Sequence, residues 1–101
     1  MRTQFGERIR ELRIQQGLFL RQVSSALEMD TALLSKIERG ERLFKKEQVA
    51  QIAIILNANA EELLTLWLAD QVMNVLKDER LADEALKKVS KNIHEKRNLR
   101  K

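Results

Sequence analysis

The sequence contains no proline, and this absence limits its possible folds more than any other feature, because proline is the strongest breaker of helices. Glycine occurs only three times, at Gly6, Gly17 and Gly40. Good helix formers such as Leu, Ala, Glu, Lys, Arg and Gln dominate the remaining residues. No segment alternates apolar and polar residues as a half-buried strand does. The sequence therefore predicts an all-α fold.

Apolar residues recur at helical spacing in five successive segments. Thr3 is a suitable N-cap for the first helix, and Gly17 is a suitable residue to end it. Asp30 and Gly40 are expected to bound the third helix in the same way. The helices expected after the first cover residues 20–27, 31–39, 45–56 and about 60–77. Whether residues 60–93 form one long helix or two is open from the sequence.

Composition and charge change along the second half of the chain. Residues 58–84 carry seven acidic and two basic side chains, whereas residues 85–101 carry seven basic side chains and one acidic one. We expect three parts: a helical domain at residues 1–66, a helical extension at 67–93 and a basic tail at 94–101. The extension has apolar stripes that a chain of this size has little other surface to cover, so they are expected to bury against a second copy.

Several classes of protein are excluded by what the sequence lacks. There is no cysteine, so disulfides, thiolate metal sites and cysteine nucleophiles cannot form. No apolar run approaches the ~20 residues of a membrane helix, and the N-terminus lacks the apolar stretch of a signal peptide. No glycine-rich phosphate loop, Ser/His/Asp set or metal-ligand spacing is present, and His94 is the only histidine. We expect no enzymatic activity, no cofactor, no metal and no membrane partner, and a cytoplasmic, nucleoid-associated location.

The stretch LFLRQVSSALEMDTALLSKIERGER, residues 18–42, is the most informative. It predicts two short helices joined by a turn of three or four residues. The apolar seam that these helices are expected to share consists of Val23, Leu27, Met29, Leu34 and Ile37. Such packing holds the second helix away from the body of the protein, and a protruding helix fits the major groove of B-DNA. The net charge of +4 is compatible with a polyanionic partner.

Three segments carry a resemblance to a known family. They are SKIERG (35–40), RIRELRIQQGL (8–18) and VAQIAIILNANAEELL (49–64), in the correct order and spacing. Together they resemble the helix-turn-helix family of phage repressors and Cro proteins, the xenobiotic-response-element type, which includes the controller proteins of restriction–modification systems. The resemblance implies a five-helix repressor-type domain that binds specific double-stranded DNA and regulates transcription.

The resemblance also implies roles for individual residues. The outward positions of the third helix, which would face base edges or nearby phosphates, are Thr31, Ala32, Ser35 and Lys36. The positions expected near the DNA backbone or minor groove are Arg21, Gln22, Arg39, Arg42, Lys45 and Lys46. Arg13 and Glu38 match a pair that usually forms a partly buried salt bridge between the first and third helices.

Five positions depart from the family pattern. Leu20 stands where Gln often contacts a phosphate, and Ser24 stands where a small Ala is usual. Glu28 occupies the turn position that usually holds Gly, so the turn must tolerate a side chain or take another geometry. Leu33 is an apolar outward residue that would either meet a thymine methyl group or pack locally. The usual proline after the third helix is replaced near Phe44.

We therefore expect a homodimeric transcriptional regulator that binds a palindromic operator. The side chains expected at the two-fold interface are Leu63, Leu66, Trp67, Val72, Met73 and Leu76. An alternative stays open: an antitoxin-like or scaffold protein whose helical extension binds a partner protein.

Overall fold

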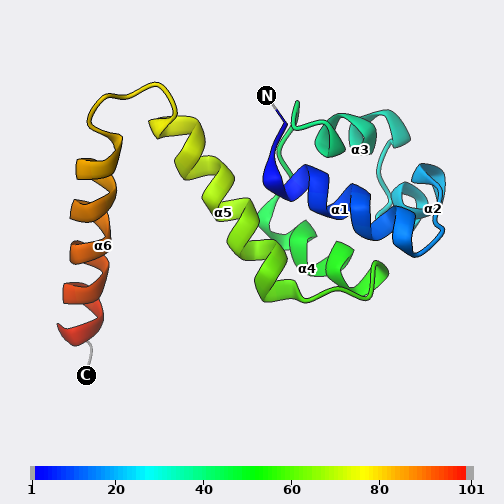
Figure 1. Ribbon diagram of the computed structural model, residues 1–101. Helices are drawn as coiled ribbons and strands as arrows, with labels where there is room; N and C mark the ends of the chain where they lie inside the picture. The colour runs from blue at the N-terminus through cyan, green and yellow to red at the C-terminus, as the bar shows by residue number, and fades with distance from the viewer. Residues whose placement is uncertain (1, 100–101) are drawn as a thin grey trace. The chain divides into compact units, whose positions relative to one another are not determined.

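Six α-helices form the structure, a computed structural model that describes residues 2–99. The helices are α1 (Gln4–Gln15), α2 (Leu20–Ala26), α3 (Thr31–Glu38), α4 (Lys46–Ile55), α5 (Ala60–Leu76) and α6 (Ala82–Leu99) (Figure 1). No strand occurs among the described residues, so the all-α prediction is confirmed. The segment after residue 60 forms two helices. Arg100 and Lys101 of the expected basic tail lie outside the described residues.

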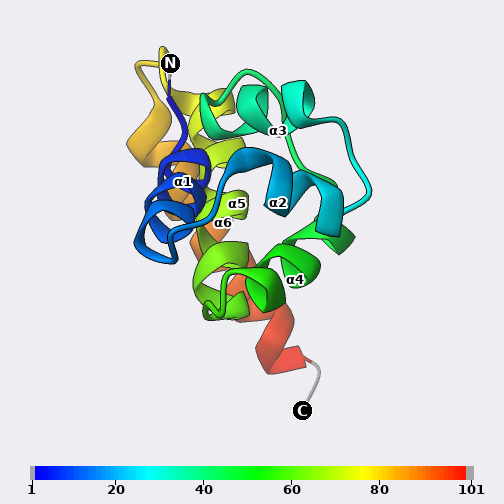
Figure 2. The same cartoon turned by 90° about the vertical axis from the view of Figure 1, so that its right-hand side faces the viewer.

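The chain divides into two compact units, Met1–Gln71 and Val72–Lys101. The first unit contains α1 to α4 and most of α5, and the second contains the end of α5 and all of α6. Figure 2 shows α1 to α4 of the first unit, with α2 and α3 joined by a turn.

Helices α1 and α3 begin directly after the N-cap residues that the sequence predicted, Thr3 and Asp30. Thr3 Oγ1 accepts a hydrogen bond from the backbone N–H of Gly6 at 2.9 Å, and Asp30 Oδ1 accepts one from Ala32 at 3.0 Å. These bonds satisfy N–H groups that have no partner inside the helix. Gly17 follows α1 with φ +70°, a left-handed conformation that glycine adopts without steric cost.

The turn between α2 and α3 contains a non-glycine residue in the left-handed region. Glu28 has φ +54°, which is the conformation that explains why glycine is favoured at this position. The turn therefore tolerates the side chain and keeps a glycine-type geometry. A left-handed residue with a Cβ atom costs about 1 kcal/mol relative to glycine.

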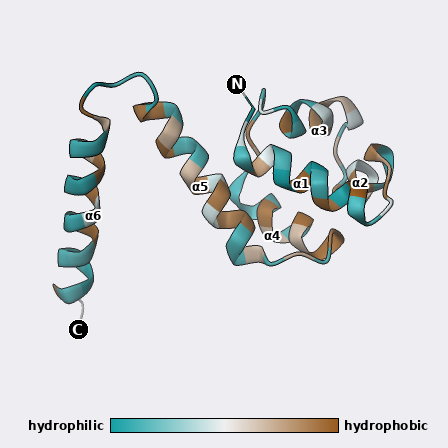
Figure 3. Ribbon diagram, in the orientation of Figure 1, coloured by the Kyte–Doolittle hydropathy of each residue, from teal (hydrophilic) through white to brown (hydrophobic). Residues whose placement is uncertain are grey.

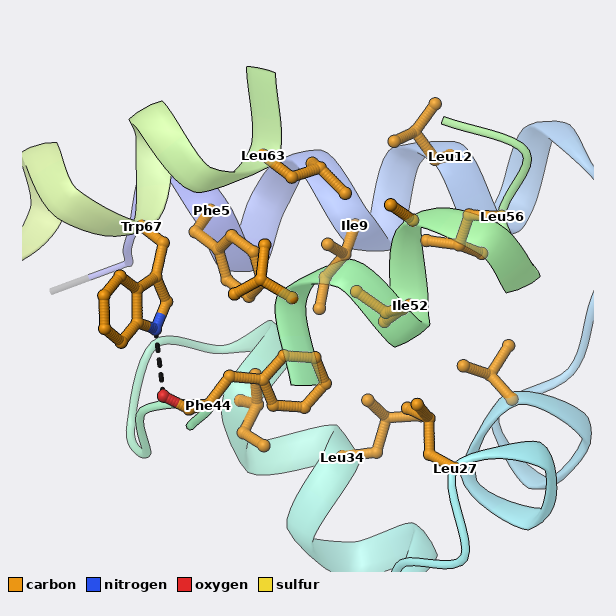
Figure 4. Close-up of a cluster of buried hydrophobic side chains, with 14 residues drawn as sticks. Phe5, Ile9, Leu12, Leu27, Leu34, Phe44, Ile52, Leu56, Leu63 and Trp67 are labelled. Carbon is orange, nitrogen blue, oxygen red and sulfur yellow. Dashed lines mark hydrogen bonds between the residues drawn. The ribbon is translucent and has the colours of Figure 1, made fainter. Parts of the chain in front are cut away.

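The core of the first unit is built from residues of all five of its helices. Figure 4 shows Phe5 and Ile9 of α1 facing Ile52 of α4 and Leu63 of α5. Phe44, in the loop before α4, is only 1% exposed, and its ring packs edge-on against Phe5 with centroids 5.5 Å apart. Phe44, near which the usual proline is replaced, is thus part of the core.

Two of the six residues predicted at the dimer interface lie instead in the core of their own protomer. Leu63 is fully buried and Trp67 is 9% exposed, both within the core of their own protomer. The indole N–H of Trp67 also donates to the backbone oxygen of Phe44 at 2.9 Å (Figure 4). Leu66 is partly buried against the same core. Leu63 and Trp67 are four residues apart and therefore share the inner face of α5, so they are not free to contact a second copy.

The outer side of α5 is apolar as well. Leu68, Val72 and Val75 recur at i, i+4 and i+7 and are 50%, 45% and 72% exposed. Between Leu63 and Leu76 the only charged side chain is Asp70. A helix that is apolar on all sides is normally covered on all sides. The core of the first unit therefore leaves this outer stripe of α5 without a partner.

Two polar contacts attach α5 to the start of α1. The carboxylate of Asp70 accepts hydrogen bonds from the backbone N–H groups of Gln4 at 3.0 Å and Phe5 at 2.8 Å. Arg8 Nε lies 2.7 Å from a carboxylate oxygen of Glu62, and this hydrogen bond is the main cause that raises the pKa of Arg8. A negative charge at a helix N-terminus is favourable, so Asp70 acts as a cap supplied by a distant element.

Helix α6, in the second unit, is amphipathic and has no buried residue. Its apolar stripe contains Leu86, Val89 and Ile93, each about half exposed. Figure 3 shows this stripe in brown along one side of α6 and polar residues in teal on the other. Residues on the polar side include Lys87, Lys88 and Lys91. Such a pattern is typical of a helix that buries one face against another element or molecule.

Candidate nucleic-acid interface

Helices α2 and α3 are held together by a shared part of the core. Val23 and Leu27 come from the α2 side, and Leu34 and Ile37 come from α3; all four are at most 8% exposed. Met29, in the turn, packs partly buried against the same cluster. The predicted apolar seam is therefore present. Because its inner face is fixed in this way, α3 presents a defined outer face to solvent.

The outer face of α3 carries the four residues predicted to meet DNA bases. Thr31, Ala32 and Lys36 are exposed, and Ser35 is half-buried. Their spacing of i, i+1, i+4 and i+5 places them on one contiguous side of the helix. Leu33 is 37% exposed and lies beside this group. The face is thus mostly polar and is about the width that a major groove admits.

Arg13 and Glu38 form a bidentate ion pair between α1 and the end of α3. Arg13 Nε lies 2.7 Å from Glu38 Oε2, and its Nη2 lies 3.0 Å from Oε1. Arg13 Nη1 also donates to the backbone oxygen of Leu18 at 2.9 Å. The two side chains are only 12% and 5% exposed. This pair fixes the end of α3 against the body of the domain.

Gly6 allows α1 to approach the end of α3 at this point. A Cβ atom at Gly6 would lie 2.5 Å from the backbone oxygen of Ile37 and 2.8 Å from that of Glu38. These distances are too short for any side chain. The position of α3 therefore depends on a close backbone contact as well as on the ion pair.

Basic side chains lie on both sides of α3 in the sequence. The exposed members of this group are Arg21, Arg39, Arg42, Lys45 and Lys46. The guanidinium of Arg21 lies 5.2 Å from the ring centroid of the exposed Phe19, and Arg39 pairs with Glu41 at 2.7 Å. Arg39 is thus partly neutralised, whereas Arg42, Lys45 and Lys46 have no ion pair among the described residues.

At the start of α2, Leu20 stands where the family pattern often has Gln, and its contacts explain the difference. The side-chain oxygen of Gln22 accepts a hydrogen bond from the backbone N–H of Phe19 at 2.7 Å, and this bond stabilises the first turn of α2. Leu20 packs partly buried against the core. Leu20 therefore contributes to packing, and the side chain of Gln22 caps the first turn of α2.

Sequence reasoning missed one polar contact in the α2–turn–α3 segment. Ser24 is 2% exposed, and its Oγ lies 2.7 Å from Oγ1 of Thr31. The position of Ser24 could have indicated this contact, because Ser24 lies next to Val23 and three residues before Leu27, on the buried face of α2. A hydroxyl group at a buried position must find a partner, and the nearest residue outside α2 that can supply one begins α3.

Other types of site find no support in the part of the chain that the structure describes. Residues 2–99 contain no group of three His, Cys, Asp or Glu side chains that could hold a metal ion. None of the helices within these residues is long and apolar enough to cross a bilayer.

Residues 4–66 match the protein family described as helix-turn-helix domain. The chain belongs to the helix-turn-helix domain family. No curated protein and no solved structure was found to match it. The matched residues include α2, the turn and α3. Domains of this family bind DNA, typically in transcription regulation, and are typically not enzymes.

Proposed function

We propose that this helix-turn-helix protein is a transcriptional regulator of the phage repressor and Cro type that binds a palindromic operator as a homodimer. One observation carries the proposal: the inner face of α3 is fixed in the core while Thr31, Ala32 and Lys36 remain exposed on its outer face. In this arrangement the recognition helix enters the major groove without rearrangement of the domain. Thr31, Ala32, Ser35 and Lys36 then face base edges.

The surrounding basic residues supply the sequence-independent part of binding. Arg21, Arg42, Lys45 and Lys46 are exposed and would contact phosphates on either side of the groove. Each phosphate contact releases counterions, so affinity should fall steeply as salt rises. Arg39 would contribute less because it already pairs with Glu41.

The homodimer is proposed from the outer stripe of α5. Leu68 and Val72 of this stripe are about half exposed, as is the neighbouring Met73, and Leu76 beside them is half-buried. A two-fold contact through this stripe would cover the exposed side of a helix that is apolar all round. Two recognition helices related in this way would read half-sites one helical turn, ~34 Å, apart.

Selection of bound sequences from a randomised duplex pool tests the proposal. We expect enrichment of a two-fold-symmetric motif, bound at least ~10³ times more tightly than random DNA. Recovery of no motif, with only weak binding that salt abolishes, would contradict it. The selected duplex then serves for fluorescence anisotropy at several salt concentrations.

Charge reversal locates the DNA-binding surface. Lys36→Glu and Lys46→Glu should each lower affinity for the selected duplex at least ~10-fold, because each replaces an attractive charge near phosphate by a repulsive one. Lys77→Glu makes the same change of charge at the end of α5 and is the matched control. Equal effects of all three variants would show that only net charge matters.

A second candidate function follows from the same apolar stripe. A protein partner could cover α5, as in an antitoxin-like or scaffold protein, with DNA binding secondary. Sedimentation of the purified chain over a wide concentration range separates the two. A dimer without other components supports the regulator. A monomer, together with a stoichiometric protein that co-purifies and is lost with Val72→Glu, supports the second function.

A further inference from the structure

The buried hydroxyl of Ser24 lies directly behind the first residue of the recognition helix. Ser24 Oγ is 2.7 Å from Thr31 Oγ1 and donates to the backbone oxygen of Arg21 at 3.3 Å. Ser24 is 2% exposed, whereas Thr31 is exposed on the outer face of α3. The pair therefore joins a buried group to a residue placed to meet DNA.

The number of hydrogen atoms determines the direction of the bond between the two hydroxyls. Each hydroxyl group has one hydrogen to donate and two lone pairs that accept. When Ser24 gives its hydrogen to Arg21, the hydrogen between Ser24 and Thr31 comes from Thr31. The opposite arrangement would leave the Arg21 contact without a hydrogen, and a buried hydroxyl favours the arrangement that makes more bonds.

We infer that Ser24 is a positioning residue that makes Thr31 present only lone pairs, and no hydrogen, to the DNA. This inference rests on the proposed function. In the major groove, the groups that donate to such an acceptor are the exocyclic amino groups of adenine (N6) and cytosine (N4). Guanine O6, thymine O4 and the purine N7 atoms are acceptors and would repel it. Thr31 therefore selects an amino group at the base edge that it faces.

The departure of this chain from the family pattern gives the inference its test. Alanine is usual at the position of Ser24 in the family that the sequence resembles, so Ser24→Ala should be compatible with the fold. In that variant Thr31 loses its internal acceptor, and its hydroxyl turns freely to donate or to accept. We expect discrimination between bases at one operator position to relax, with little loss of affinity for random DNA.

The experiment compares sequence selection by the wild type, Ser24→Ala, Thr31→Val and the double variant, all as full-length chains. Thr31→Val keeps the shape of the side chain and removes the hydroxyl. The operator position at which this variant changes the base preference is therefore the position that Thr31 faces. For the wild type we expect a preference of about fivefold for the amino group of the adenine or cytosine at that base pair, the effect of one neutral hydrogen bond. Affinity for duplexes in which purine replaces adenine, or 2-pyrimidinone replaces cytosine, measures this preference. Ser24→Ala should lower this preference to about twofold, and it should change nothing further in the Thr31→Val background.

Several results would overturn the inference. At that base pair, equally tight wild-type binding after adenine is replaced by purine, or cytosine by 2-pyrimidinone, contradicts the acceptor role of Thr31, because these bases lack the amino group. Equal weakening of all duplexes by Ser24→Ala, with unchanged base preference, shows that Ser24 only supports the fold. In both cases the wild type still selects a motif, so the proposed function stands. A wild type that selects no motif overturns the function and the inference together.

Discussion

At the scale of single residues, Glu28 is a position where the backbone and the side chain are in conflict. Its φ of +54° suits glycine, and the side chain makes no hydrogen bond or ion pair among the described residues that would offset the strain. Glu28→Gly should raise the free energy of unfolding by about 0.5–1 kcal/mol, because the relief of strain exceeds the added entropy of the unfolded chain. Urea denaturation followed by circular dichroism measures this change. The control is Glu41→Gly, which should not stabilise the protein.

The Arg13–Glu38 pair is expected to contribute far more than an ordinary surface pair. Removal of one partner leaves a poorly solvated charge, so Glu38→Ala should lower the free energy of unfolding by about 3 kcal/mol. Glu41→Ala breaks the exposed pair with Arg39 and should change it by less than ~1 kcal/mol. Chemical denaturation of both variants compares them directly. Similar small losses in the two variants would show that burial of the first pair adds nothing.

At the scale of helices, Trp67 connects α5 to the loop that follows α3. Trp67→Phe keeps most of the apolar surface but removes the N–H that donates to Phe44. The buried carbonyl oxygen then has no donor, and we expect a loss of about 1–2 kcal/mol in the free energy of unfolding. Thermal unfolding followed by circular dichroism provides the measurement. No loss would mean that water replaces the indole.

The sequence predicted the helices where a local signal exists and could not predict which side of α5 is inner. Thr3, Asp30 and Gly17 mark helix ends because capping depends on neighbouring residues in the chain. Leu63, Trp67 and Val72, by contrast, all lie on a helix that is apolar all round, so periodicity does not distinguish its two sides. That distinction depends on residues far away in the chain.

The candidate site shows the same division between local and distant information. The outward face of α3 followed from the helical period and the family pattern. The contact of Ser24 with Thr31 depends on the angle between α2 and α3, which the left-handed Glu28 turn helps to set. Neither the angle nor that contact is encoded in the spacing of apolar residues.

At the scale of the whole molecule, the first unit reaches beyond the family match. The match ends at residue 66, but Trp67 and Asp70 complete the core and the cap of α1. A fragment of residues 1–71 should fold cooperatively. A fragment of residues 1–66 should be about 3–5 kcal/mol less stable, since it loses a buried tryptophan. Unfolding curves of the two fragments would also test the domain boundary expected at residue 66.

Assembly is tested by charges placed on the outer stripe of α5. Leu68→Glu and Val72→Glu should shift the protein to monomers in sedimentation experiments and reduce the steepness of operator binding with concentration. Because both side chains are exposed, stability should change little. Ile54→Glu, at an 82% exposed position on α4, is the matched control and should leave assembly unchanged.

The contact of Asp70 with the first turn of α1 has a consequence for how the chain is made. The amide groups of Gln4 and Phe5 leave the ribosome before their carboxylate partner, Asp70, which is translated 66 residues after Gln4 and 65 after Phe5. During synthesis α2 and α3 can therefore form while α1 still lacks its cap and the core lacks Trp67. We therefore expect the outer face of α3 to become fixed only after α5 has emerged from the ribosome.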